Sequence, residues 1–86
     1  MNKSAKDMFE ELGYGETEND IYFLKYYKPC KLQRGKEIKF CKLDKTFTTF
    51  TVKDDDDDFI RHSWINAPEL QAINQQCKEL GWFDEL

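Results

Sequence analysis

A run of five consecutive aspartates is the most prominent group in this chain whose residue types could do chemistry. Its members are Asp54, Asp55, Asp56, Asp57 and Asp58, which we call the aspartate run. Adjacent carboxylates repel one another and cannot be buried together without cationic partners, so the run indicates a solvated loop or an interaction surface. We predict these five residues as the partner-binding site.

Two interpretations of the aspartate run remain open, and a third does not fit. The run is not a calcium-binding loop, because Phe59 stands where the sharp turn needs glycine and Ile65 where a bidentate glutamate belongs. One interpretation is mimicry of a phosphate backbone in the basic groove of a nucleic-acid enzyme. The alternative is a loop that only improves solubility.

The residue types used in catalysis and metal binding do not form a complete set. His62 is the only histidine, and its neighbour Ser63 lacks the third group that orients a nucleophile and its base. Cys30, Cys41 and Cys77 could join His62 as zinc ligands, but their spacing contains no local ligand pair. Three cysteines without a C-x-x-C pair fit reduced thiols in a cytosolic protein. We therefore predict no catalytic residue, metal site or cofactor, and a protein that is not an enzyme.

Charge is distributed in blocks along the 86 residues, whose net charge is −4. Residues 1–24 carry 2 basic and 6 acidic side chains, residues 25–53 carry 9 and 2, and residues 54–86 carry 2 and 9. The middle block is basic and aromatic, a composition that can follow a phosphate backbone and stack bases. The alternative function is therefore nucleic-acid binding through Lys25, Lys39 and Lys42. The net charge of the chain argues against this alternative.

Two amphipathic helices are expected to position these charged groups from the two ends of the chain. The first is predicted over Ala5 to Leu12, with Ser4 as its N-cap and Gly13 ending it in a left-handed conformation. This ending lets Tyr14 fold back onto Phe9.

The second helix follows Asn66, whose spacing from Glu69 is that of a capping box, and Pro68 lies in its first turn. Gly81 ends it, so that Trp82 can pack back onto the helix. Its apolar stripe is predicted to be Leu70, Ile73, Cys77 and Leu80.

Between the helices, apolar residues recur with the period of strands. Three strands are predicted, over Ile21 to Tyr27, Glu37 to Leu43 and Thr46 to Val52. Pro29 and Gly35 bracket a longer connection, and Asp44-Lys45 indicates a tight hairpin. The fold class is α+β: a three-stranded antiparallel meander in the order α-β-β-β-α, covered on one face by two helices, forming one domain over residues 1–86.

The register of the third strand is open at this stage. Phe47 and Phe50 are three residues apart and cannot share one face of a regular strand, so the strand either carries a bulge or exposes one phenylalanine. The segment from Phe59 to Ile65 is a candidate for a short additional edge strand. An open meander also leaves edges available for self-association, so we expect a monomer or a weak homodimer.

The sequence composition indicates the cellular compartment in which we expect the protein. The chain has no apolar stretch of the length that a membrane helix needs, so no membrane partner is expected. Asp7, Glu10 and Glu11 interrupt the region where a signal peptide needs apolar residues. We therefore expect a cytoplasmic protein.

Two segments carry a resemblance to a known group of proteins. Residues 4–14, which end in Leu-Gly-Tyr, and residues 68–82, which end in Leu-Gly-Trp, resemble small uncharacterised proteins of phages and prophages in low-GC Gram-positive bacteria. The resemblance implies an accessory protein in a bacterial cytoplasm and supplies no catalytic residue. Together with the charge pattern, it leads us to expect a non-enzymatic protein that binds an unidentified host or phage protein, in one version as an acidic inhibitor of a host defence or nucleic-acid enzyme.

Overall fold

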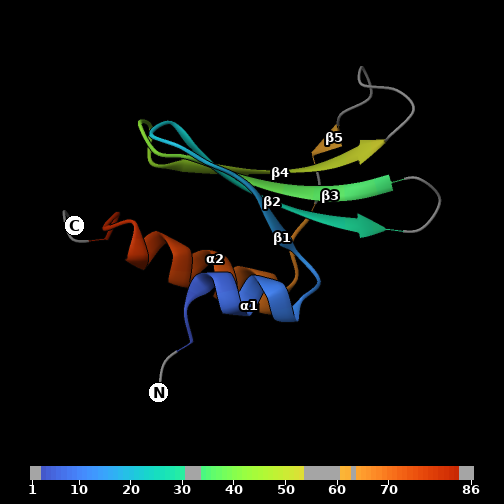
Figure 1. Cartoon of the computed structure of the whole chain (residues 1–86), viewed down its shortest axis with the longest axis horizontal. Helices are drawn as coiled ribbons and strands as arrows, with labels where there is room; N and C mark the ends of the chain where they lie inside the picture. Colours follow the sequence, from blue (N-terminus) through green and yellow to red (C-terminus); the bar gives the residue numbers. More distant parts are fainter. Residues whose placement is uncertain (1–2, 31–33, 54–60, 63, 84–86) are drawn as a thin grey trace.

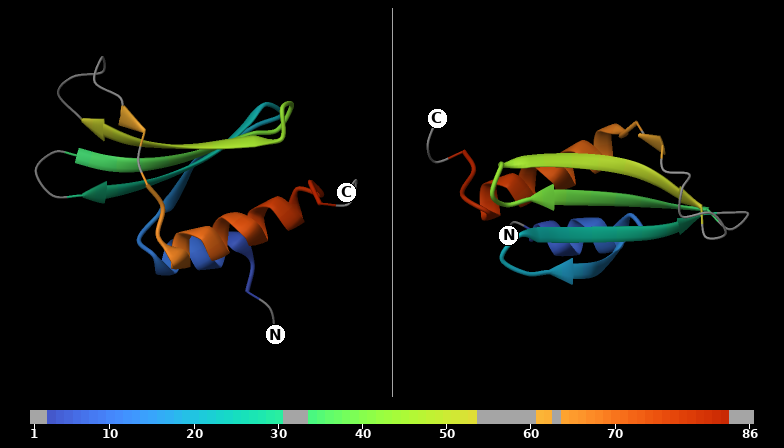
Figure 2. Two further views of the ribbon diagram at one scale, coloured as in Figure 1. Left: turned by 180° about the vertical axis from the view of Figure 1, so that it is seen from behind. Right: turned by 90° about the horizontal axis from the view of Figure 1, so that it is seen from above.

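The computed structural model describes residues 3–30, 34–53, 61–62 and 64–83, which form two helices and one antiparallel sheet (Figure 1). The element order is α1 (Ala5–Glu11), β1 (Gly15–Asn19), β2 (Phe23–Cys30), β3 (Arg34–Cys41), β4 (Thr46–Lys53), β5 (Arg61–His62) and α2 (Ala67–Glu79). The strands lie in the sheet in chain order. Both helices lie on the same side of the sheet, and α2 crosses under β3 and β4 (Figure 2). The α+β class and the covered antiparallel meander are confirmed.

The predicted number of three strands is wrong, because the sheet has four long strands and the two-residue β5. The missed strand is β1, whose sequence Gly-Glu-Thr-Glu-Asn has no apolar side chain. Glycine, glutamate and asparagine are depleted in strands, so no local signal indicated it. β1 forms because its backbone pairs with β2, a contact between segments that the sequence pattern does not indicate. The short strand β5 lies within the segment from Phe59 to Ile65, where an edge strand was expected.

The predicted long connection between Pro29 and Gly35 is also wrong. Both residues lie in strands and are direct partners across β2 and β3. Proline is tolerated here because β1 begins at Gly15, opposite Tyr27, so no described strand pairs with β2 at Pro29 on the side away from β3. A Cβ atom at Gly35 would fall on the ring of Tyr27, which shows that the tyrosine ring lies across the glycine. Glycine therefore serves here to admit an aromatic ring.

The pairing of β3 with β4 determines which faces of the sheet Phe47 and Phe50 occupy. Lys45 adopts a left-handed conformation, with φ of 57°, in the expected turn. Pairing of β3 with β4 is regular, with Phe47 opposite the buried Phe40 and Phe50 opposite Glu37. The strand therefore has no bulge at this point, and Phe50 faces away from the helices because successive side chains alternate.

The ends of both helices are confirmed. The Ser4 hydroxyl accepts a hydrogen bond from the Asp7 N–H at 3.1 Å. Gly13 has a φ of +95°, and the Tyr14 N–H donates to the Phe9 carbonyl at 2.9 Å, which completes a Schellman ending. Because these contacts lie within a few residues of one another, the local sequence was sufficient to predict them.

Helix α2 follows the same pattern at its ends and differs in the face it buries. Asn66 and Glu69 form the expected capping box, and the Trp82 N–H donates to the Cys77 carbonyl at 3.0 Å. Leu70, however, is 49% exposed, so its assignment to the buried stripe is wrong. The buried residues of α2 are Glu69, Ala72, Ile73, Gln76 and Cys77. The helix is rotated so that a carboxylate and an amide enter the interior.

The core is built around stacked aromatic rings. Phe9 of α1 stacks on Tyr26 of β2 with ring centroids 4.1 Å apart, and Phe40 of β3 meets both rings edge-on. All three side chains are almost completely buried. The Tyr26 hydroxyl donates to the Gln76 side-chain oxygen at 2.7 Å, so the polar end of the ring is satisfied inside the core. These contacts join α1, the sheet and α2.

We expect Phe9→Ala to lower the free energy of unfolding by about 3–5 kcal/mol, because it leaves a cavity among rings that cannot collapse fully. Ile21→Ala is the control, since Ile21 is 74% exposed and should change the value by less than about 0.5 kcal/mol. Urea unfolding of both variants measures the difference. Equal effects would contradict the placement of Phe9 at the centre of the core.

Candidate functional site

The aspartate run, predicted to bind a partner, lies outside the described residues. This holds for each of its five members, Asp54, Asp55, Asp56, Asp57 and Asp58. Along the chain the run stands between β4 and β5, which are neighbours in the sheet, since Thr51 pairs with Arg61. The structure therefore neither confirms nor contradicts a role of these carboxylates, and partner binding by the run stays a prediction.

The three lysines of the nucleic-acid alternative do not share one face. Lys25 and Lys39 are direct partners on β2 and β3. They face away from the helices, because their neighbour Tyr26 is buried in the core and side chains alternate. Lys42 lies beyond β3, where its Nζ donates to the Asn19 side chain at 2.8 Å. Lys42 therefore ties the β1–β2 turn to the next hairpin and lies apart from the other two lysines.

The uncovered face of the sheet carries as many carboxylates as lysines among the described residues. Lys39 Nζ lies 5.2 Å from the ring centre of Phe23 and 5.3 Å from that of Phe50. Lys25 forms an ion pair with Glu18 of β1 at 3.6 Å. Glu37 is the direct partner of Phe50, so it lies on the same face. This face is aromatic but close to neutral, which does not favour binding of a phosphate backbone.

Other lysines of the described strands are engaged elsewhere. Lys28 Nζ lies 5.6 Å from the ring centre of Tyr14, and Lys36 forms an ion pair with Glu69 on the helix side of the sheet. Alternation along the strands therefore sends the lysines to different surfaces. Although residues 25–53 carry a net positive charge, their described lysines do not gather on one basic face of the fold.

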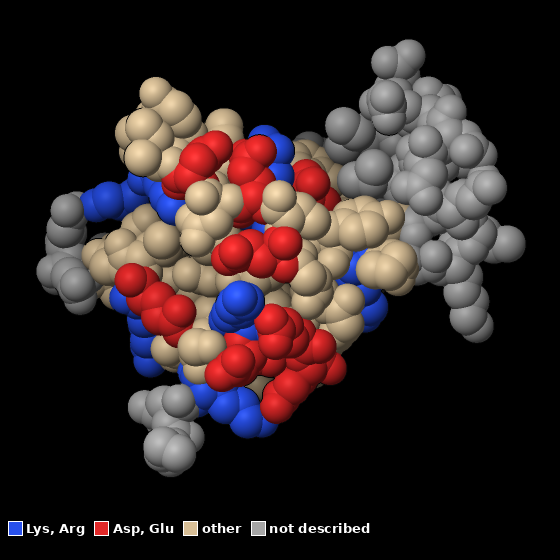
Figure 3. Space-filling model, in the orientation of Figure 1, with Lys and Arg blue, Asp and Glu red and all other residues tan. Residues whose placement is uncertain are grey.

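Exposed carboxylates gather over α1 and β1 (Figure 3). We define the acidic face by its exposed members, which are Asp7, Glu10, Glu11, Glu16 and Glu79. Lys3 pairs with Glu11 at 2.5 Å, but both side chains are more than half exposed, so the pair contributes little to stability. The acidic face is therefore a solvated surface on which five described carboxylates outnumber the two lysines of residues 3–24, Lys3 and Lys6.

The acidic face includes residues from three elements, of which α2 is distant in sequence from the other two. Burial raises the pKa of Tyr26, and the carboxylates of Glu16, Glu79 and Glu10 add to this increase. These three carboxylates come from β1, α2 and α1, so the fold brings them close to the same hydroxyl. Glu79 also accepts a hydrogen bond from the Ala5 N–H at 2.7 Å, which places the end of α2 against the start of α1.

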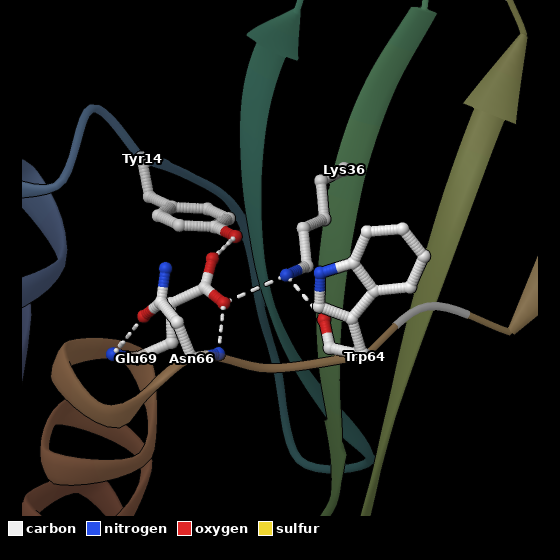
Figure 4. A network of polar contacts seen from close by, with 5 residues as sticks. All are labelled: Tyr14, Lys36, Trp64, Asn66 and Glu69. Atoms are coloured by element: carbon white, nitrogen blue, oxygen red, sulfur yellow. Dashed lines mark hydrogen bonds and ion pairs between the residues drawn. The ribbon is translucent and has the colours of Figure 1, made fainter.

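A different carboxylate, Glu69, lies at the centre of a buried polar network (Figure 4). It is 3% exposed and accepts hydrogen bonds from the Tyr14 hydroxyl at 2.6 Å and from Lys36 Nζ at 2.7 Å. It also accepts from the Asn66 N–H at 2.9 Å, as the capping box requires. Lys36 donates in addition to the Trp64 carbonyl at 2.5 Å. Each hydrogen bond drawn in Figure 4 thus involves a charged side chain or a backbone group.

The ionisation of Glu69 follows from this environment. Burial raises its pKa, but the hydrogen bonds from Lys36, Tyr14 and Asn66 together outweigh burial, and the net pKa is lowered. The group is ionised and paired, which suits a structural role. The capping-box spacing predicted one of its partners, whereas Tyr14 and Lys36 are remote in sequence and gave no signal.

Other groups with shifted pKa values also serve the fold. Backbone N–H groups of Phe23 and Tyr22 lower the pKa of Asp20, which fixes the turn before β2. Burial raises the pKa of the Cys77 thiol and so disfavours its nucleophilic thiolate. In the described parts of the chain, no three His, Cys, Asp or Glu residues are grouped so as to hold a metal ion.

An apolar groove of about 520 Å³ opens between β4 and α2. We call it the β4–α2 groove, and it is lined by Lys45, Phe47, Leu70, Ile73, Asn74, Cys77, Trp82 and Phe83. Its wall includes Leu70, the residue that the sequence pattern wrongly assigned to the core. The groove was therefore not predicted, because its existence depends on the rotation of α2.

Comparison with protein-family models, curated proteins and solved structures finds no match for this chain. Neither helix in the described part of the chain is long and apolar enough to cross a bilayer.

We expect Glu69→Gln to lower the free energy of unfolding by about 2–4 kcal/mol at neutral pH, because the amide leaves Lys36 without its counter-charge. The pKa of Glu69 is lower in the folded chain than its ordinary value of 4.5, so its contribution is complete above that value and is lost as the pH falls through the folded pKa. The difference between wild type and variant should therefore shrink as the pH falls below about 4.5.

Urea unfolding at a series of pH values measures this difference. Glu16→Gln is the matched control, because Glu16 is exposed and its loss should change stability by less than about 0.5 kcal/mol. A difference between wild type and Glu69→Gln that is constant with pH would show that Glu69 is not the ionised centre of the network.

Nucleic-acid binding by the uncovered face can be tested separately. Because Lys25 and Lys39 are balanced by Glu18 and Glu37, we expect no mobility shift of a single-stranded oligonucleotide at low salt. A salt-sensitive shift that Lys25→Ala and Lys39→Ala weaken, while Lys42→Ala leaves it unchanged, would instead establish this face as a nucleic-acid site.

Proposed function

We propose that this chain is a non-enzymatic accessory protein of a phage or prophage, and that it acts by binding another protein through its negative surface. The acidic face of α1, β1 and the end of α2 is the observation that carries the proposal (Figure 3). The aspartate run would extend the same negative character. The partner is a host or phage protein with a basic surface, which is complementary in charge.

Long-range electrostatics support this mode of action. The chain has a net charge of −4, and residues 3–24 contribute six carboxylates against two lysines. Such an excess steers a basic partner toward the surface and raises the association rate, an effect that salt screens over about 8–10 Å. A partner that binds through charge would therefore bind more weakly as ionic strength rises.

The specific version of the proposal is inhibition of a host defence or nucleic-acid enzyme. Enzymes that act on nucleic acids bind phosphates in basic grooves, and carboxylates on a compact protein can compete for those grooves. The resemblance of residues 4–14 and 68–82 to small phage and prophage proteins supports this context, because such proteins act inside the infected cell.

The state of the polar groups in the described residues supports a binding role over a catalytic one. Glu69 is held by Tyr14 and Lys36, and the Tyr26 hydroxyl is held by Gln76. Catalytic groups need a reactive proton or lone pair that faces substrate. These buried groups instead use their hydrogen bonds to join helices to strands.

We expect a purified partner, captured from host lysate in the presence of nuclease, to bind the wild-type chain in a salt-sensitive manner. Glu10→Gln combined with Glu16→Gln should weaken binding roughly three- to tenfold at low salt, because two exposed charges on the acidic face are lost. Replacement of all five aspartates of the aspartate run by asparagine tests the contribution of the run in the same assay. Titration calorimetry at two salt concentrations measures each effect.

The control removes two carboxylates from other surfaces, by Glu37→Gln and Asp44→Asn, and so produces the same net charge as the double variant of the acidic face. Equal weakening by the control would show that net charge, and not the acidic face, determines binding. Capture that disappears with nuclease would contradict the proposal, because nucleic acid would then be the bridge.

A further inference from the structure

The two edges of the sheet differ in their protection against further strand pairing. At the β1 edge, the strand has only five residues, carries Glu16 and Glu18, and its register shifts between them. Charges, short length and bulges are the features that keep an edge strand from pairing with another chain. The β1 edge is therefore protected.

The β4 edge is short as well, but it lacks charged residues and a bulge. From Thr46 to Val52 the strand has no charged residue and no proline, and it pairs with β3 without a register shift. Within the described residues, β5 pairs only with Phe50 and Thr51, so no strand lies beside Thr46, Phe47 or Thr48 on the side away from β3. We define these three residues as the β4 edge. Their backbone presents a short, neutral template for another strand.

Apolar surface adjoins this edge on the helix side. Phe47, Leu70 and Phe83 are 39%, 49% and 40% exposed, and all three line the β4–α2 groove. Figure 2 shows α2 crossing beneath β4, and among the described residues β5 extends the sheet beyond β4 only at Phe50 and Thr51. An unprotected edge and an apolar groove therefore lie next to each other, and together they resemble one half of an interface.

We propose that a second copy of this chain occupies the β4 edge, with the two β4 strands pairing antiparallel about a two-fold axis. Charge favours this place over the rest of the described surface for a second copy. Two copies of a chain with net charge −4 repel each other over most of their surface, but among the described residues that line the β4–α2 groove Lys45 is the only charged one and none is a carboxylate. Two-fold pairing places each residue opposite its own type or a near neighbour, and a neutral Thr-Phe-Thr edge tolerates this without repulsion.

The geometry also explains why assembly stops at two copies. A two-fold contact uses the same patch on both copies, so both β4 edges are consumed in one event. Among the described strands, the edges that remain are then the protected β1 edge and the two-residue β5, and edges of these kinds oppose growth into a filament. The acidic face lies on the side of β1 and α1, so the dimer leaves both acidic faces exposed. The proposal uses a different surface from the proposed partner binding, and either can fail without the other.

Sedimentation equilibrium of the full chain over a range of concentrations up to millimolar tests the proposal. We expect the mass to rise from 10.3 kDa to twice that value. Thr46→Lys places two like charges near the axis, and Leu70→Lys charges the groove while keeping good helix propensity. Each should weaken dimerisation by roughly tenfold or more, since like charges facing each other across a strand pair or a desolvated groove oppose association.

Thr17→Lys is the matched control, because it makes the same replacement at an exposed threonine of the β1 edge. It should leave the dimer intact, and circular dichroism checks that every variant is folded. A wild-type chain that stays at 10.3 kDa at all concentrations would overturn the proposal. So would a dimer that Thr46→Lys and Leu70→Lys leave unchanged, or one that Thr17→Lys disrupts as strongly.

Discussion

The buried carboxylate of Glu69 is the constraint on which the arrangement of the elements depends. An ionised group that is 3% exposed is costly unless every lone pair is satisfied, and its partners come from the end of α1, from β3 and from the segment before α2. Satisfying it fixes where α2 begins and how it is rotated about its axis. That rotation places Ile73 and Cys77 in the core and leaves Leu70 beside β4. The β4–α2 groove thus follows from the need to satisfy the buried carboxylate of Glu69.

The sheet separates two kinds of surface at its opposite edges. The β1 edge, together with α1, is rich in carboxylates, whereas the described residues that line the β4–α2 groove are mostly apolar and include no carboxylate. Here the separation arises because a meander keeps the chain order of its strands, so the acidic first segment and the neutral last long strand lie at opposite margins.

The net charge of a sequence segment does not predict the charge of the surface that the segment forms. The strand segment, residues 25–53, is strongly basic in sequence, yet the described residues do not form a basic face. Side chains alternate along a strand, so neighbouring lysines such as Lys36 and Lys39 point to opposite sides of the sheet. One is neutralised by Glu69 inside the fold, and the other lies between the rings of Phe23 and Phe50. The acidic segment behaves differently, because a short surface helix such as α1 leaves most of its carboxylates exposed.

By itself, the sequence determined the two helices, their caps and their glycine endings, the α+β class and the hairpin at Lys45. These features depend on contacts within a few residues, such as Ser4 with Asp7 or Tyr14 with Phe9, so the local chain contains all the information. Only the tertiary structure decided the existence of β1, the exposure of Leu70, the partners of Glu69 and the gathering of Glu10, Glu16 and Glu79. Each of these depends on backbone pairing or burial between separate segments, and the energy of such contacts is not determined by the pattern of any single segment.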